Sequence, residues 1–130
     1  MKEDEALGML EGQRHMTANM LINHFAFTDG AFPEEPTWLA AAARALPPDD
    51  LPLLLRFITG IGRLGLDGSL PPSDNRDTRI LIRFGLSHAD SLPTSHTCFY
   101  QLDMPHYASA NMLLDKLRRS IHGDLSMGIA

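Results

Sequence analysis

Apolar residues alternate with other side chains over residues 78–84, which read Thr-Arg-Ile-Leu-Ile-Arg-Phe. Ile80, Ile82 and Phe84 occupy every second position of this stretch. Alternation with a period of two is typical of a strand that buries one face. Residues 78–84 are therefore predicted to form a strand with these three side chains in a core.

Elsewhere apolar residues recur at three- and four-residue spacing, which predicts amphipathic helices. The three predicted helices are residues 37–46, residues 50–60 and residues 109–121. Thr37, Asp49 or Asp50, and Ser109 are the expected N-caps, because their side chains can accept from free helical N–H groups. Prolines follow the first helix and glycines follow the other two, as is common where helices end.

Shorter elements complete the predicted fold. A short helix is expected at residues 1–10, a second at 17–23, a short strand at 24–27 and another at 97–102. Residues 28–33 are rich in turn-forming residues and suit a hinge. The sum is an α/β (α+β) fold, in which a small mixed sheet packs with helices.

Composition narrows the possible partners. A chain of 130 residues suits one domain, and its net charge of -5 leaves no basic stripe for nucleic acid. No apolar run approaches the roughly 20 residues of a membrane helix. One cysteine and an acidic N-terminus without a signal-peptide core predict a reducing, cytoplasmic setting, with the nucleus as an alternative.

Cys98 is the only cysteine, so an internal disulfide is impossible. Three roles are then possible for Cys98: packing as a small hydrophobic residue, metal ligation, or action as a nucleophile. Pro93 and the polar run at 94–97 predict a surface loop before it, whereas Phe99 and Leu102 predict a return to the core. A thiol at such a junction would be accessible and yet held in place.

A glycine pattern at residues 60–65 fits G-x-G-x-x-G. A dinucleotide site needs a strand before this pattern, a helix after it and an acidic residue about 20 positions on. Here a helix is predicted before the glycines and turns after them. The glycines are therefore interpreted as serving tight turns.

Residues 92–99, Leu-Pro-Thr-Ser-His-Thr-Cys-Phe, resemble the active-site segment of HECT-type ubiquitin ligases, as do residues 101–107, Gln-Leu-Asp-Met-Pro-His-Tyr. Residues 56–64 are similar to that family's helix end and turn, and residues 107–121 to its last helix. The resemblance implies a HECT C-terminal catalytic lobe at 34–130, a hinge at 28–33, and a remnant of the N-terminal lobe at 1–27.

Two positions depart from the family pattern. Met127 stands where the family has a phenylalanine, fourth from its end, and Gly65 stands where the family usually has proline. The change at Met127 removes the ring with which the tail would dock. Most of the N-terminal lobe is also missing, so the chain is expected to be a fragment, a truncated gene product or an isolated lobe.

The resemblance implies that Cys98 is the ubiquitin acceptor. It would take ubiquitin from a ubiquitin-conjugating enzyme as a thioester and pass it to a lysine of a substrate protein. His96 could stabilise the thiolate or shuttle a proton, since residues i and i+2 of an extended segment share a face. The alternative for His96 is a loop histidine bonded to the backbone.

Three further residues are tentative members of this site. Thr97 is expected to orient the loop, and Met127 to help position the tail. Asp103 could polarise the incoming lysine, or it could cap a turn before Pro105.

Other interpretations of the chain stay open at this point. A truncated lobe without most of its docking surface could bind ubiquitin or a ligase without turnover. A cysteine protease would use His88, His96 or His106 with Cys98, but no protease signature surrounds the cysteine. Zinc bound through His96, Cys98 and His106 would lack a second cysteine. Neither a cofactor nor a metal is expected.

Overall fold

A four-stranded mixed sheet forms one layer of the computed structural model, which describes residues 16–62, 64–65, 67–74, 76, 78–85 and 91–123. The strand order is β1-β2-β4-β3. The strands are β1 (Phe25–Phe27), β2 (Ile80–Phe84), β4 (Gln101–Met104) and β3 (Thr94–His96). β1, β2 and β4 run parallel, and β3 is antiparallel to β4. The predicted class, a small mixed sheet packed with helices, is confirmed.

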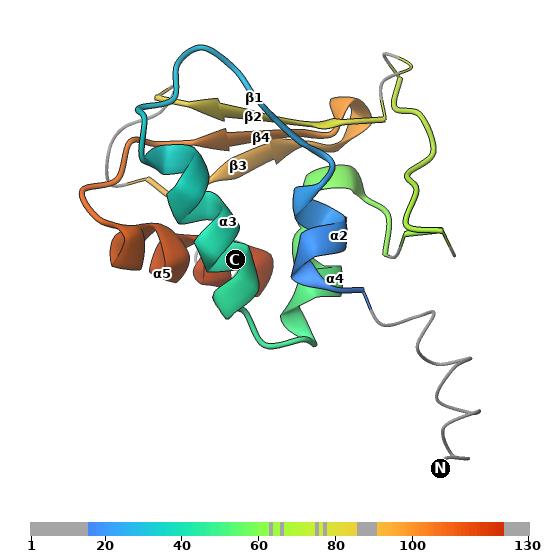
Figure 1. Cartoon of the computed structure of the whole chain (residues 1–130), viewed down its shortest axis with the longest axis horizontal. Helices are drawn as coiled ribbons and strands as arrows, with labels where there is room; N and C mark the ends of the chain where they lie inside the picture. The colour runs from blue at the N-terminus through green and yellow to red at the C-terminus, as the bar shows by residue number, and fades with distance from the viewer. Residues whose placement is uncertain are drawn as a thin grey trace.

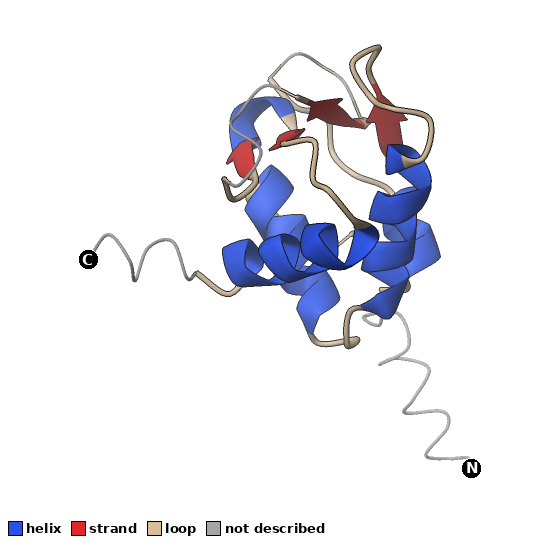
Figure 2. Cartoon of the chain, turned by 90° about the vertical axis from the view of Figure 1, so that its left-hand side faces the viewer, coloured by secondary structure: helices blue, strands red, loops and turns tan. Residues whose placement is uncertain are grey.

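Among the described residues, four α-helices accompany the sheet: α2 (Ala18–Ile22), α3 (Glu35–Ala45), α4 (Asp50–Thr59) and α5 (Ala110–Ile121). Figures 1 and 2 show α3, α4 and α5 on one side of the strands. Ile80, Ile82 and Phe84 of β2 are all buried, as their alternation predicts. None of the described helices is long and apolar enough to span a bilayer.

The last helix forms where the sequence predicts it. The Ser109 hydroxyl accepts a hydrogen bond from the Met112 N–H at 3.1 Å, so Ser109 is the N-cap of α5. Leu113, Leu117 and Ile121 recur at helical spacing, and all three are buried. This apolar stripe attaches α5 to α3 and α4.

The first long helix begins earlier than predicted. α3 starts at Glu35, so Thr37 lies inside the helix and the expected Thr37 cap is wrong. Pro36 is tolerated in the first turn, where a missing N–H costs no helical hydrogen bond. The Glu35 carboxylate instead accepts the Phe32 N–H at 2.7 Å, which directs the chain into the helix two residues sooner.

The segment around the cysteine also differs from the prediction of a strand at 97–102. Residues 94–96 form the edge strand β3, residues 97–99 form the 3₁₀ turn η1, and only residues 101–104 continue as β4. β3 lies at the edge of the sheet, and Thr94 and His96 are exposed. An edge strand with polar side chains gives no apolar alternation, so its sequence suggests a loop.

The N-terminal part of the described chain joins the same sheet. Thr17 caps α2 through its hydroxyl, and β1 pairs with β2 with Phe25 opposite Ile80. The Thr28 N–H continues this pairing by donating to the Ile82 carbonyl at 3.1 Å. The lobe boundary at residue 27 and the hinge at 28–33 stay predictions, and the helix expected at 1–10 lies outside the described residues.

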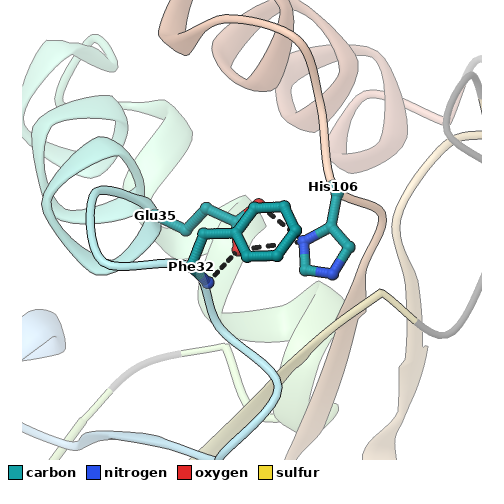
Figure 3. Close-up of polar contacts among 3 residues, drawn as sticks. All are labelled: Phe32, Glu35 and His106. Atoms are coloured by element: carbon teal, nitrogen blue, oxygen red, sulfur yellow. Dashed lines mark hydrogen bonds and ion pairs between the residues drawn. The ribbon is translucent and has the colours of Figure 1, made fainter.

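A buried carboxylate ties the turn before α3 to the connection between β4 and α5 (Figure 3). Glu35 is only 1% exposed, and its Oε2 atom lies 2.8 Å from Nδ1 of His106. The Phe32 ring stacks on the His106 ring, with 3.8 Å between centroids and 9° between planes. Phe32, Glu35 and His106 therefore form one cluster that joins residues about 70 positions apart.

Candidate active site

Cys98 lies on η1 (Thr97–Phe99), the single 3₁₀ turn that connects β3 to β4 among the described residues. It is an exposed free thiol, so the interpretation of Cys98 as a buried packing residue is wrong. The neighbouring Phe99 is 42% exposed. The thiol is therefore accessible to a macromolecule as well as to small reagents.

Backbone hydrogen bonds hold the turn that carries this thiol. The carbonyl of Cys98 accepts from the Asp74 N–H at 3.0 Å, and the Thr97 carbonyl accepts from the Tyr100 N–H at 3.2 Å. Helix α4 packs against η1, and its C-cap Gly60 faces Thr97. The position of Cys98 is thus set by a hydrogen bond within the turn and by contacts from two other segments, the one that contains Asp74 and helix α4.

The candidate residues His96 and Asp103 contact each other. Nε2 of His96 lies 3.1 Å from Oδ2 of Asp103, and Gln101 Nε2 donates to Oδ1 of the same carboxylate at 2.9 Å. Asp103 is 7% exposed, whereas the His96 side chain is 52% exposed. Cross-strand pairing of His96 with Gln101 places all three side chains on one face of the β3–β4 ribbon.

The positions of His96 and Asp103 differ from those expected from the sequence. The extended segment ends at His96, so the expectation that His96 and Cys98 share a face of one strand is wrong. Asp103 lies within β4 and its carboxylate bonds to His96 and Gln101, so it does not serve as the cap expected before Pro105. The buried Asp103 carboxylate instead orients the imidazole of His96, and His96 precedes Cys98 by two residues.

Gln101 and Tyr100 are site residues that the sequence reasoning missed. The period of two that places Gln101 beside Asp103 was available in the sequence, and it is the signal that could have identified Gln101. Tyr100 is buried, and burial followed by the nearby Asp74 charge raises the pKa of its phenol. No signal in the sequence indicates its left-handed backbone, with a φ of 53°.

The other sequence candidates lie elsewhere. His106 bonds to Glu35, in the cluster described above. Met127 and His88 lie outside the described residues. Within the described ranges, no group of three or more His, Cys, Asp or Glu side chains could hold a metal ion. The candidate site thus consists of an exposed thiol and an imidazole–carboxylate pair whose histidine precedes the cysteine by two residues.

Comparisons with known proteins show what this chain is similar to. Residues 1–130 match a family model described as HECT-domain (ubiquitin-transferase). The chain is 35% identical over 85 residues to an E3 ubiquitin-protein ligase TOM1-like of Neurospora crassa. The matched region covers 65% of this chain and 2% of that protein. It is 31% identical over 86 residues to E3 ubiquitin-protein ligase UPL1 of Arabidopsis thaliana, with the same coverages.

A third relative belongs to the same class. The E3 ubiquitin-protein ligase NEDD4 of Rattus norvegicus is 34% identical over 86 residues, covering 65% of this chain and 10% of that protein. The chain therefore spans only 2% of the first two relatives and 10% of the third.

Proposed function

The chain belongs to the HECT-domain (ubiquitin-transferase) family, and on that premise we propose that it is a ubiquitin-protein transferase in which Cys98 carries ubiquitin as a thioester. One observation carries this proposal. The only cysteine of the chain is exposed on a turn held by hydrogen bonds, and it follows by two residues a histidine whose imidazole bonds to a buried carboxylate.

The first step is a thioester exchange. The Cys98 thiolate attacks the carbonyl carbon at the ubiquitin C-terminus, which the ubiquitin-conjugating enzyme holds as a thioester. The new C–S bond forms on Cys98, and the conjugating enzyme's cysteine leaves as a thiolate. Reactant and product are both thioesters, so orientation is the main contribution of the protein. A free thiol is only a few per cent ionised at neutral pH but is intrinsically nucleophilic.

The second step forms the isopeptide bond. The ε-amine of a substrate lysine attacks the Cys98 thioester, the C–S bond breaks, and the amine loses a proton. We assign that proton to His96, which precedes Cys98 by two residues, because its imidazole bonds to Asp103 and its side chain is exposed to solvent. Thr97 orients the turn by accepting the Tyr100 N–H, and Met127 is proposed to act from the tail.

The partners follow from this reaction. They are ubiquitin, a ubiquitin-conjugating enzyme and a substrate protein that presents a lysine. Residues 34–130 are proposed as the catalytic lobe, residues 28–33 as the hinge and residues 1–27 as the end of the larger lobe. The docking surface for the conjugating enzyme would then lie mostly outside this chain.

A donor that needs no conjugating enzyme gives the sharpest test. Ubiquitin with a small-thiol thioester at its C-terminus is mixed with the chain, and adducts are resolved on gels with and without reductant. The parent chain is expected to form an adduct that reductant removes. Cys98→Ser should give an adduct that resists reductant, since an ester replaces the thioester, and Cys98→Ala should give none.

Two results would contradict the proposal. A reducible adduct on Cys98→Ala would place the chemistry elsewhere. A folded parent chain that binds ubiquitin but forms no adduct would indicate a binding module without catalysis. We keep this alternative because the chain covers only a small share of each relative.

A further inference from the structure

Tyr100 follows Cys98 by two residues and has a backbone conformation that residues with a Cβ rarely adopt. Its φ is 53° and its ψ is 51°, in the left-handed region. Tyrosine gains nothing there from local hydrogen bonding, unlike asparagine or aspartate. Such a conformation persists only where the surrounding structure enforces it, and it is found most often at functional sites.

The surroundings of Tyr100 supply that enforcement. Its side chain is buried, and its hydroxyl donates to the Pro71 carbonyl at 2.7 Å. Its carbonyl accepts the Leu81 N–H at 2.8 Å, and its N–H donates to the Thr97 carbonyl. Every polar group of Tyr100 therefore has a hydrogen-bond partner, so both its backbone and its phenol hydroxyl are held in place.

The segment that receives the phenol also contacts the cysteine. Pro71 accepts from Tyr100, and three residues later the Asp74 N–H donates to the Cys98 carbonyl. The turn and residues 71–74 are thus joined at two points, one on each side of Phe99. A shift of one point moves the other, because only two residues separate Pro71 from Asp74.

We infer that Tyr100 is a positioning residue for Cys98, which it holds through the brace formed by residues 71–74. This inference rests on the proposed function and deepens it. The phenol is buried, so it acts through the backbone of the turn and not on ubiquitin. Acyl transfer between two macromolecules depends on orientation, whereas alkylation by a small reagent does not.

Tyr107 provides a matched control. It is also buried, and its hydroxyl donates to the Ser91 carbonyl at 2.5 Å. Tyr100→Phe and Tyr107→Phe each remove one buried hydroxyl that bonds a backbone carbonyl. Only the first hydroxyl belongs to the brace, so a general loss of stability should affect both variants alike.

Three rates are compared in the parent chain and both variants. Amide hydrogen exchange of Asp74 should become about fivefold faster in Tyr100→Phe, the effect of losing one hydrogen bond of ordinary net strength. Transfer from the ubiquitin thioester to Cys98 should fall roughly tenfold, since small displacements are costly in oriented reactions. Alkylation by iodoacetamide should change less than twofold, and Tyr107→Phe should change none of the three.

The outcomes separate this inference from the proposed function. If the parent chain forms no thioester, Asp74 exchange still decides whether Tyr100 holds the turn. Unchanged Asp74 exchange in Tyr100→Phe, equal effects in both variants, or a parallel fall of transfer and alkylation would overturn the inference. Should Tyr100→Phe not fold, Tyr100→Asn, which suits a left-handed backbone, is expected to show the same loss of transfer.

Discussion

Removing the Glu35 carboxylate should destabilise the fold far more than a typical surface substitution. In Glu35→Ala, the Phe32 N–H loses its 2.7 Å acceptor and the His106 ring loses both carboxylate oxygens. A hydrogen bond to a charged group contributes about 1.5–3 kcal/mol, and the lower end applies to both contacts because they are only partly buried. Alanine has a more favourable helix propensity than glutamate, which offsets a few tenths of a kcal/mol of this loss. The expected loss in the free energy of unfolding is about 3 kcal/mol.

The pairing itself can be isolated with a second substitution. His106→Ala leaves the Glu35 carboxylate buried with one remaining donor, so this change should also be strongly destabilising. In the double variant neither partner of the pair is left alone. Its loss should therefore be smaller than the sum of the two single losses, by about 1–3 kcal/mol.

Urea unfolding followed through the fluorescence of Trp38 measures these effects. Trp38 is the only tryptophan and lies on α3, one turn after Glu35. With a denaturant slope of about 1.5 kcal/mol per molar, a loss of 3 kcal/mol moves the midpoint by roughly 2 M. A loss below about 1 kcal/mol in Glu35→Ala, or strict additivity in the double variant, would refute the reasoning.

Two further expectations concern tyrosine ionisation and the glycine turns. Burial raises the pKa of Tyr107 above its usual 10.0, so the unfolded chain loses this proton first, and the free energy of unfolding should fall as pH rises above 10. Titrating stability in Tyr107→Phe should show a shallower fall; an unchanged slope would contradict it. Gly60→Ala should cost about 1 kcal/mol for its positive φ, whereas Gly85→Ala should cost more, because its Cβ would overlap the His106 ring. Thermal unfolding of the two variants tests that order, and equal losses would be the contrary result.

Elements with local signals were predictable from the sequence. The Ser109 cap and the buried stripe of α5 lie within one segment, and the alternation in β2 reports its own buried face. The exposed cysteine was also predictable, since polar residues and a proline precede it. In each case the residues that decide the structure are neighbours in the chain.

The missed features depend on residues that are distant in sequence. α3 begins at Glu35 in a setting completed by His106, 71 residues later. β3 has no apolar face of its own and becomes a strand through pairing with β4. The contact between His96 and Asp103 likewise requires the antiparallel pairing of those two strands. Sequence periodicity reports burial but not such partners.

The pairing of β1 with β2 has a consequence for where the chain can be cut. A piece that starts at residue 28 would lack β1 and would leave the β2 backbone from Ile80 to Ile82 without its partner strand on one side. That strand is rich in isoleucine, leucine and phenylalanine, the composition that favours pairing between molecules. We therefore expect a piece without residues 25–27 to self-associate more readily than the longer chain, although these residues are far in sequence from the cysteine.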